Sequence, residues 1–136
     1  MILHFQLGQG DTQQQTRPVY VTELSDKKCI AVACGHYHSL ALSVDHRVWS
    51  WGWGVHGQLG VGSIEDVLLP THIAGLDEFE ITQLAAGYSH SAVLSAKVFF
   101  VNLQEIDMRK YEIYFSCDVF SFCRDKSSHL VEVIKQ

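Results

Sequence analysis

The sequence predicts an all-β fold, a partial β-propeller of antiparallel four-stranded blades that does not close into a ring within this chain. Three observations predict it. The chain repeats itself with a period of 52 residues and without a gap. Short β-prone runs are separated by turn residues at regular intervals. No helical periodicity of 3.6 residues interrupts them between residues 6 and 96, and a fixed period of this length is typical of propellers or solenoids.

The repeat is visible as identities between residues 6–44 and residues 58–96. Twelve of these 39 positions are identical. In the first copy they are Gln6, Leu7, Gly8, Gly10, Pro18, Leu24, Ala33, Gly35, His38, Ser39, Leu42 and Ser43. One such repeat cannot bury its apolar face alone, so the two copies are expected to pack on one another.

Four short strands are predicted in the first repeat. Residues 18–21 begin with a proline, which is tolerated at the first position of a strand because no ladder donor is needed there. The continuous apolar run of residues 29–34 predicts a buried strand, and residues 38–43 alternate as a second one. Residues 48–51 predict a further strand, which leads into a glycine-rich loop over residues 52–62.

The second repeat predicts the same order of strands. Residues 70–73, 81–86 and 90–95 match the first three strands of the first copy. Four strands in 52 residues correspond to one blade of a propeller. We therefore expect propeller repeats within residues 1–96, divided at about 6–57 and 58–96.

Residues 97–136 are predicted to be a non-repeat tail. They contain neither glycine nor proline, whereas ten glycines precede them. The runs 98–101, 113–115 and 119–122 are β-prone, and residues 129–134 fit either a strand or a helix. The tail carries no motif that we connect with a function.

Charge and cysteine usage limit the partners that we expect. The formal net charge is −5, and the tail contributes none of it because it holds six residues of each sign. The acidic repeats make direct binding of nucleic acid or of an anionic membrane unfavourable. The N-terminus lacks the pattern of a signal peptide. We expect a cytoplasmic or nuclear protein with free thiols at Cys29, Cys34, Cys117 and Cys123.

The repeat resembles that of the regulator of chromosome condensation family. The resemblance rests on residues 33–42, 48–52, 57–62 and 85–91, with Pro70 between them in the same order. It implies blades of a propeller of about seven blades. The family's roles include nucleotide exchange on a small nuclear GTPase, ubiquitin-ligase scaffolding, ciliary GTPase-linked interaction and ultraviolet sensing in plants.

The recurring motif residues are predicted to be structural. Gly35 and Gly87 are expected at tight turns with positive φ, and His38 and His90 are expected to bond to neighbouring backbone. Leu42, Leu59 and Trp51 are predicted to fill the space between blades. The full set of motif residues is Gly35, His38, Trp49, Trp51, Gly52, Gly57, Leu59, Gly60, Gly62, Pro70, Gly87 and His90.

Three more specific functions fit the sequence poorly: a hydrolase, a metal site and an ultraviolet sensor. The run 87–91 is one residue from a nucleophile elbow, but it leads into a strand instead of a helix. His36 and His38 would supply a metal with two ligands, whereas zinc takes about four. Trp49, Trp51 and Trp53 alternate along one face, but the positions after Gly35 and Gly87 that carry the sensing tryptophans in the plant photoreceptor hold His36 and Tyr88. We expect no catalytic residue, cofactor or metal.

The predicted function is a protein–protein interaction module of a propeller scaffold, in a truncated fragment or isoform. The alternatives are part of a guanine nucleotide exchange factor for a small GTPase, or a truncated product without function. The acidic pairs 65–66 and 77–78 would contact a basic partner or simply remain solvated. Partly wet faces at Trp49, Trp51 and Leu42 would leave the chain marginally stable and prone to self-association.

Overall fold

The structure, a computed structural model, describes residues 4–96 and 131–132. Within these residues the fold is all-β, with two open antiparallel sheets and three short 3-10 helices. Blade 1 has the strand order β1-β2-β3-β4, formed by Cys29–Cys34, His38–Ser43, Val48–Gly52 and Val67–His72. Blade 2 has the order β5-β6-β7, formed by Ile81–Ala86, Ser91–Ser95 and Val131–Glu132. The predicted partial propeller is confirmed.

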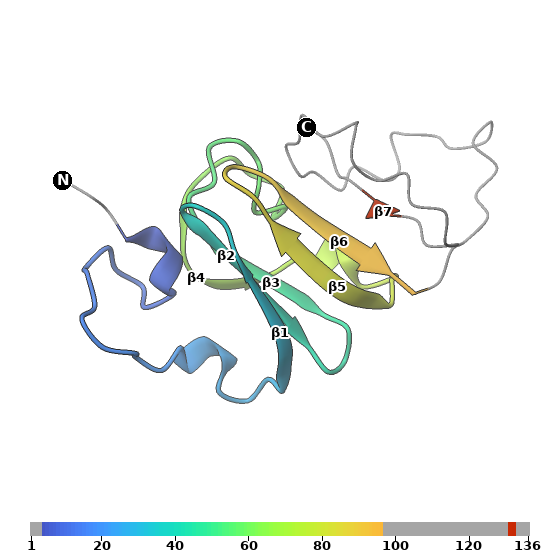
Figure 1. The fold of residues 1–136 in the computed structure, drawn as a ribbon, viewed down its shortest axis with the longest axis horizontal. Coiled ribbons are helices and arrows are strands. Elements are labelled where there is room, and N and C mark those ends of the chain that lie inside the picture. Colours follow the sequence, from blue (N-terminus) through green and yellow to red (C-terminus); the bar gives the residue numbers. More distant parts are fainter. Residues whose placement is uncertain (1–3, 97–130, 133–136) are drawn as a thin grey trace.

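Blade 1 is a meander of antiparallel hairpins. Cys34 pairs with Ser39 across the first turn, and Ala41 pairs with Trp49 in the next hairpin. His46 closes the turn between β2 and β3 with a positive φ of 65°. The β1–β2 and β5–β6 hairpins lie side by side, as Figure 1 shows.

The fourth strand of blade 1 comes from the start of the second repeat. β4 pairs with β3, with Trp49 opposite His72. The strand predicted over residues 18–21 was wrong, because the structure has no strand between residues 8 and 21. The equivalent of β3 that would pair with this segment is absent from the described residues. A lone strand has no ladder to satisfy its backbone groups.

Blade 2 takes its third strand from far along the chain. Val93 pairs with Glu132, and Leu94 with Val131, so β7 occupies the position that β3 has in blade 1. The strand alternative for residues 129–134 is thus confirmed at Val131–Glu132. The predicted β-prone runs 98–101, 113–115 and 119–122 lie outside the described residues.

The hydrophobic core lies between the two blades and continues under the link between them. Leu40, Leu42 and Val48 of blade 1 are fully buried, and Val93 of blade 2 is 3% exposed. The expectation of partly wet faces was wrong for Leu42 and for Trp51, which is 5% exposed. Leu42 lies in the inter-blade core. Trp51 is packed by residues 5–8, the segment that contains 3-10 helix η1 (Phe5–Leu7).

The prediction that residues 29–34 form a strand is confirmed, but their predicted burial was wrong. Ala31 and Ala33 pack against the core, whereas Ile30 is 59% and Val32 70% exposed. Only one face of β1 meets blade 2, and no described residue covers the other face. The apolar run alone did not reveal this asymmetry.

Gly35 and Gly87 are required by close approach, not by positive φ. Neither has a positive φ. A Cβ atom on Gly35 would lie 2.1 Å from the His38 ring, and one on Gly87 would lie 1.9 Å from the His90 ring. The predicted positive φ at these two glycines was therefore wrong, and each glycine instead gives space to the histidine three residues later.

No helix among the described residues is long and apolar enough to span a membrane.

Candidate functional site

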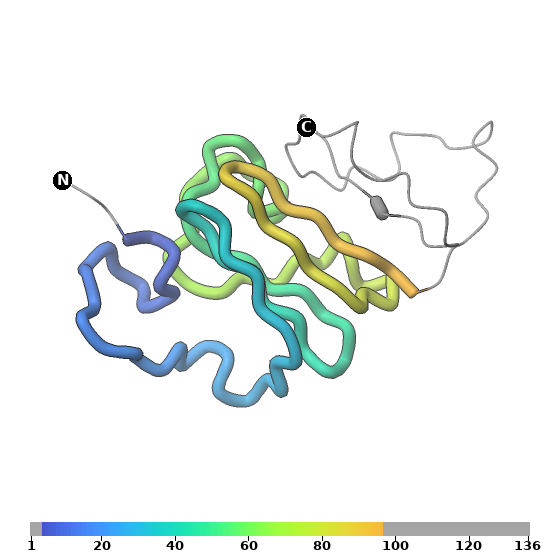
Figure 2. The backbone as a smooth tube through the Cα atoms, viewed as in Figure 1, coloured from blue at the N-terminus to red at the C-terminus, as the bar shows by residue number. Residues whose placement is uncertain are grey.

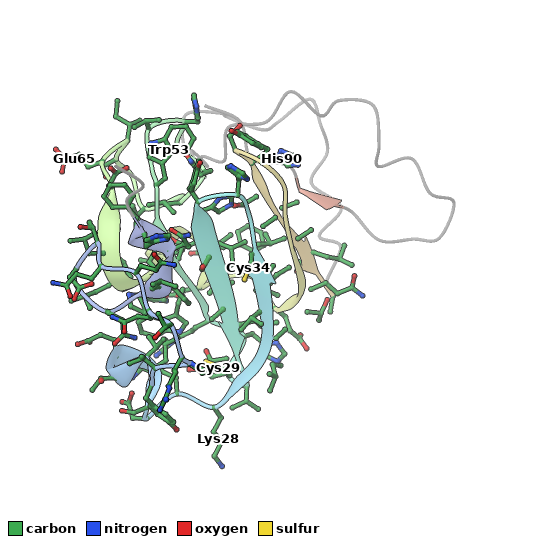
Figure 3. All side chains as sticks on the ribbon, turned by 60° about the vertical axis from the view of Figure 1, so that its left-hand side comes forward. Lys28, Cys29, Cys34, Trp53, Glu65 and His90 are labelled. Carbon is green, nitrogen blue, oxygen red and sulfur yellow. The ribbon has the colours of Figure 1, made fainter. Side chains whose placement is uncertain are left out.

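Three loops gather at one end of the two blades. They are the β1–β2 turn at residues 35–37, the long loop at residues 53–66 and the β5–β6 turn at residues 87–90. Figure 2 shows the three loops together at the upper end of the view. In Figure 3, Trp53, Glu65 and His90 lie toward this end, opposite Lys28. Loops held by a rigid sheet are the usual carriers of binding residues.

Five rings form a continuous row across these loops, which we call the aromatic row: Tyr88, His36, Tyr37, Trp53 and His56. The His36 ring stacks on Tyr88 at 4.2 Å and meets Tyr37 edge-on at 4.1 Å. Tyr37 meets Trp53 at 5.8 Å, and Trp53 meets His56 at 4.8 Å. Tyr88 is 61% exposed. The row therefore crosses from blade 2 to blade 1 and ends in the long loop.

The backbone conformation of Gly52 positions Trp53 in the aromatic row. Its φ is +112°, and a Cβ atom there would lie 2.4 Å from the Tyr37 carbonyl oxygen. The next amide, Trp53 N–H, donates to that same carbonyl at 2.8 Å. Gly54 N–H donates to the Asp66 carboxylate at 2.9 Å, which ties the two ends of the long loop together. The backbone thus holds the aromatic row in place before any partner binds.

A buried polar chain lies between the blades. The Ser91 hydroxyl donates to the Gln58 carbonyl at 2.8 Å, and it lies 2.9 Å from His38 Nε2. A hydroxyl has one proton to donate, so Nε2–H of His38 donates to Ser91 and Nδ1 carries no proton. Burial, partly offset by the backbone of His90, lowers the pKa of His38 to about 4. His38 is therefore neutral at pH 7, and it meets both the Ser91 side chain and the backbone of His90.

The same arrangement recurs one repeat earlier. The Ser39 hydroxyl donates to the Gln6 carbonyl at 2.9 Å, as Ser91 does to Gln58. Trp51 Nε1 donates to the same Gln6 carbonyl at 2.8 Å. The repeat therefore preserves its hydrogen bonds as well as its residues.

The remaining predicted motif residues occupy structural positions. Gly57, Gly60 and Gly62 have positive φ, and Pro70 is buried within β4. Leu59 is fully buried, and Trp49 packs on His72 with ring centres 5.2 Å apart. None of these side chains belongs to the aromatic row.

The described residues form neither the metal site nor the shared tryptophan face that the sequence analysis considered. His36 is exposed on Tyr88, whereas His38 is fully buried against Ser91. Among the described residues, no group of three or more His, Cys, Asp or Glu side chains could hold a metal ion. Trp53 leaves the strand that carries Trp49 and Trp51, because β3 ends at Gly52. The three tryptophans therefore do not share one face.

Sequence reasoning did not find the aromatic row. A signal was present, since His36 and Tyr88 occupy the same position of the two repeats, directly after Gly35 and Gly87. What the sequence did not show is that blade packing brings these turns together. The backbones of Gly35 and Gly87 approach so closely that a Cβ on Gly35 would lie 2.6 Å from the Gly87 carbonyl oxygen.

A family comparison places these features in a known repeat. The family model described as "Regulator of chromosome condensation (RCC1) repeat" matches residues 4–42 and 45–94, and a second model of that description matches residues 29–58. The chain belongs to the RCC1 repeat family. The RCC1 matches together cover the two copies of the repeat seen in the structure.

Individual RCC1 relatives are much longer than this chain. Over 92 residues it is 45% identical to the human "Probable E3 ubiquitin-protein ligase HERC6", covering 66% of this chain and 9% of the relative. It is 40% identical over 92 residues to the Arabidopsis thaliana "RCC1 domain-containing protein RUG3, mitochondrial", covering 68% and 21%. The crystal structure of human WBSCR16 matches with a TM-score of 0.50 and 36% identity, covering 52% of this chain and 18% of that one.

Proposed function

We propose that this chain is a protein–protein interaction module of a propeller scaffold, and that the aromatic row is its contact surface. The observation that carries the proposal is the row itself, in which Tyr88 is 61% exposed and stacked on His36. Tyrosine and tryptophan are enriched among the residues that contribute most to protein interfaces. They bury a large area at a small cost in conformational entropy.

The contacts that hold the aromatic row in place favour a binding function over a catalytic one. His38 is neutral and fully enclosed, and its hydrogen bond is with Ser91 inside the joint between blades. The exposed rings are held by one another and by the backbone contact between Trp53 and Tyr37. A pre-organised surface loses little entropy on binding. The relatives named as ubiquitin ligases support a scaffolding role. We further propose a cytoplasmic or nuclear location.

The test is a comparison of bound partners. Tagged full-length chain would be expressed in cells, captured and analysed by quantitative mass spectrometry, with Trp53→Ala and Tyr88→Ala as row variants. Tyr20→Ala is the control, because Tyr20 is 79% exposed but lies outside the row. We expect one set of proteins to be lost from both row variants and kept by the control. An identical set in all four samples would refute the proposal.

Nucleotide exchange on a small GTPase is the finer alternative that the family resemblance raises. It requires the chain to accelerate the release of a bound guanine nucleotide. Fluorescent-nucleotide release from a nuclear small GTPase, with and without the purified chain, tests it directly. An accelerated release that Trp53→Ala abolishes would make the GTPase the partner of the aromatic row.

A further inference from the structure

One face of β1, the edge strand of blade 1, is apolar and uncovered by any described residue. It consists of Ile30, Val32 and Cys34, which alternate along β1 and which we call the outer face. Ile30 is 59% exposed and Val32 is 70% exposed, and Cys34 is also exposed. Two large β-branched side chains so exposed on one strand indicate a surface that binds another apolar face.

The second repeat shows what covers this face. The residues that lie one repeat of 52 positions after Val32 and Cys34 are Leu84 and Ala86. Leu84 and Ala86 are packed against the inter-blade core, to which blade 1 contributes Leu40, Leu42 and Val48. The residues that pack on the same core from the blade 1 side include Ala31 and Ala33 of β1. Val32 and Cys34 are thus the repeat equivalents of residues in a joint that is already formed within the chain, whereas Thr82, the equivalent of Ile30, is exposed.

Blade 2 offers the matching side of that joint. Gln83 and Ala85 of β5 pair with Leu94 and Ala92 of β6, so these four side chains share one face of blade 2. They are the repeat equivalents of Ala31, Ala33, Leu42 and Leu40. Gln83 and Ala85 are exposed, and Ala92 and Leu94 are half-buried. We call this the free face of blade 2, because blade 1 packs on the opposite face, which carries Leu84, Ala86 and Val93.

We infer that the outer face of blade 1 docks on the free face of blade 2 of a second copy of this chain, in the same register as the two blades within one chain. This goes beyond the proposed function, and its tests substitute no residue of the aromatic row. The register predicts a specific polar contact as well. His90 of one copy would donate to Ser39 of the next, as His38 donates to Ser91. The Ser39 hydroxyl already donates to Gln6, so it has lone pairs left to accept this bond.

The proposed contact between copies is head-to-tail, because it joins two different surfaces of the chain. Such a contact adds further copies until a ring closes or a filament grows. Ala92 replaces the larger Leu40 of the intrachain joint, and Gln83 replaces Ala31. The contact between copies therefore buries less apolar surface than the joint within the chain, and it is expected to dissociate on dilution.

The first test is size-exclusion chromatography with light scattering over a dilution series of the full chain. Val32→Glu places a charge in the outer face, and Val44→Glu is the matched control, because Val44 is 54% exposed in the β2–β3 turn. We expect association in the wild type and in Val44→Glu, and a monomer for Val32→Glu. A wild-type monomer at every concentration would overturn the inference.

The second test reports the register. Ala33 and Ala86, which both pack against the inter-blade core, are the repeat equivalents of Ala85 and Cys34. The same register between copies is therefore expected to bring Ala85→Cys of one copy near the native Cys34 of the next. Under mild oxidation we expect a crosslink between positions 34 and 85 of two chains, identified by peptide mass spectrometry and absent when Cys34→Ser is added. Association that persists in Val32→Glu without this crosslink would also overturn the inference, since the copies would then meet elsewhere.

Discussion

His38 and Ser91 are joined by a hydrogen bond of 2.9 Å that crosses from one blade to the next. They are 53 residues apart in sequence, one residue more than the repeat period. Each is the counterpart of a residue in the other blade, namely His90 and Ser39. The contact between His38 of the first repeat and Ser91 of the second therefore ties the two blades together.

Ser91→Ala should destabilise the chain by about 1–3 kcal/mol, because it leaves His38 Nε2–H and the Gln58 carbonyl buried without their partner. Ser89→Ala is the matched control, since Ser89 lies in the adjacent β5–β6 turn and is only half-buried. Its cost should stay within about 0.5 kcal/mol. Urea unfolding followed by tryptophan fluorescence measures both. Equal stability of the two variants would show that the inter-blade bond contributes nothing.

The buried imidazole predicts a loss of stability in mild acid. The pKa of His38 is about 4 in the folded chain and about 6.5 when unfolded. Between these values the unfolded chain binds a proton that the folded chain does not, so stability falls as the pH falls from 6.5 toward 4. Between pH 7.5 and pH 5 the loss from this residue should be about 2 kcal/mol.

The measurement is the free energy of unfolding at several pH values in the wild type and in His38→Gln. We expect the variant to be less stable at pH 7.5 but to lose less stability on acidification. Parallel curves for the two proteins would assign the acid sensitivity to other groups.

Gly52→Ala should be far more damaging than Gly62→Ala. Both glycines have positive φ, 112° and 84°. A Cβ atom on Gly52 would lie 2.4 Å from the Tyr37 carbonyl oxygen and 2.7 Å from the His38 Cα, whereas one on Gly62 meets nothing within 4 Å. Gly62→Ala should cost about 1 kcal/mol, and Gly52→Ala about 3 kcal/mol or more. Thermal melts compare them, and a similar loss in both would show that backbone strain alone is responsible.

Trp51→Phe should release residues 4–10 from blade 1. The indole Nε1–H donates to the Gln6 carbonyl at 2.8 Å, and the ring packs against Gly8. We expect a cost of about 1 kcal/mol and faster hydrogen exchange at Gly10, whose amide bonds to the Leu68 carbonyl. Trp53→Phe is the control, since Trp53 contacts Tyr37 and His56 instead. Unchanged exchange at Gly10 would show that Trp51 does not anchor this segment.

The amino-acid sequence alone determined the repeat and most of its strands. The 52-residue period, the turn glycines and the apolar runs predicted strands at 29–34, 38–43, 48–51 and 81–86, which match β1, β2, β3 and β5. These segments pair with their neighbours along the chain, so local patterns contain the information that they need. The family resemblance followed from the same residues, because motif residues recur at one spacing.

Tertiary structure decided the features that depend on which surfaces meet. Residues 18–21 have the composition of a strand, yet they form none, and none of the strands that the structure describes pairs with them. Val32 and Leu84 occupy equivalent positions, but only Leu84 packs against the core. The aromatic row exists because the packing of blade 2 on blade 1 carries Tyr88 onto His36. Strand pairing and side-chain burial depend on both of the surfaces that meet, whereas a local sequence pattern describes only one of those surfaces.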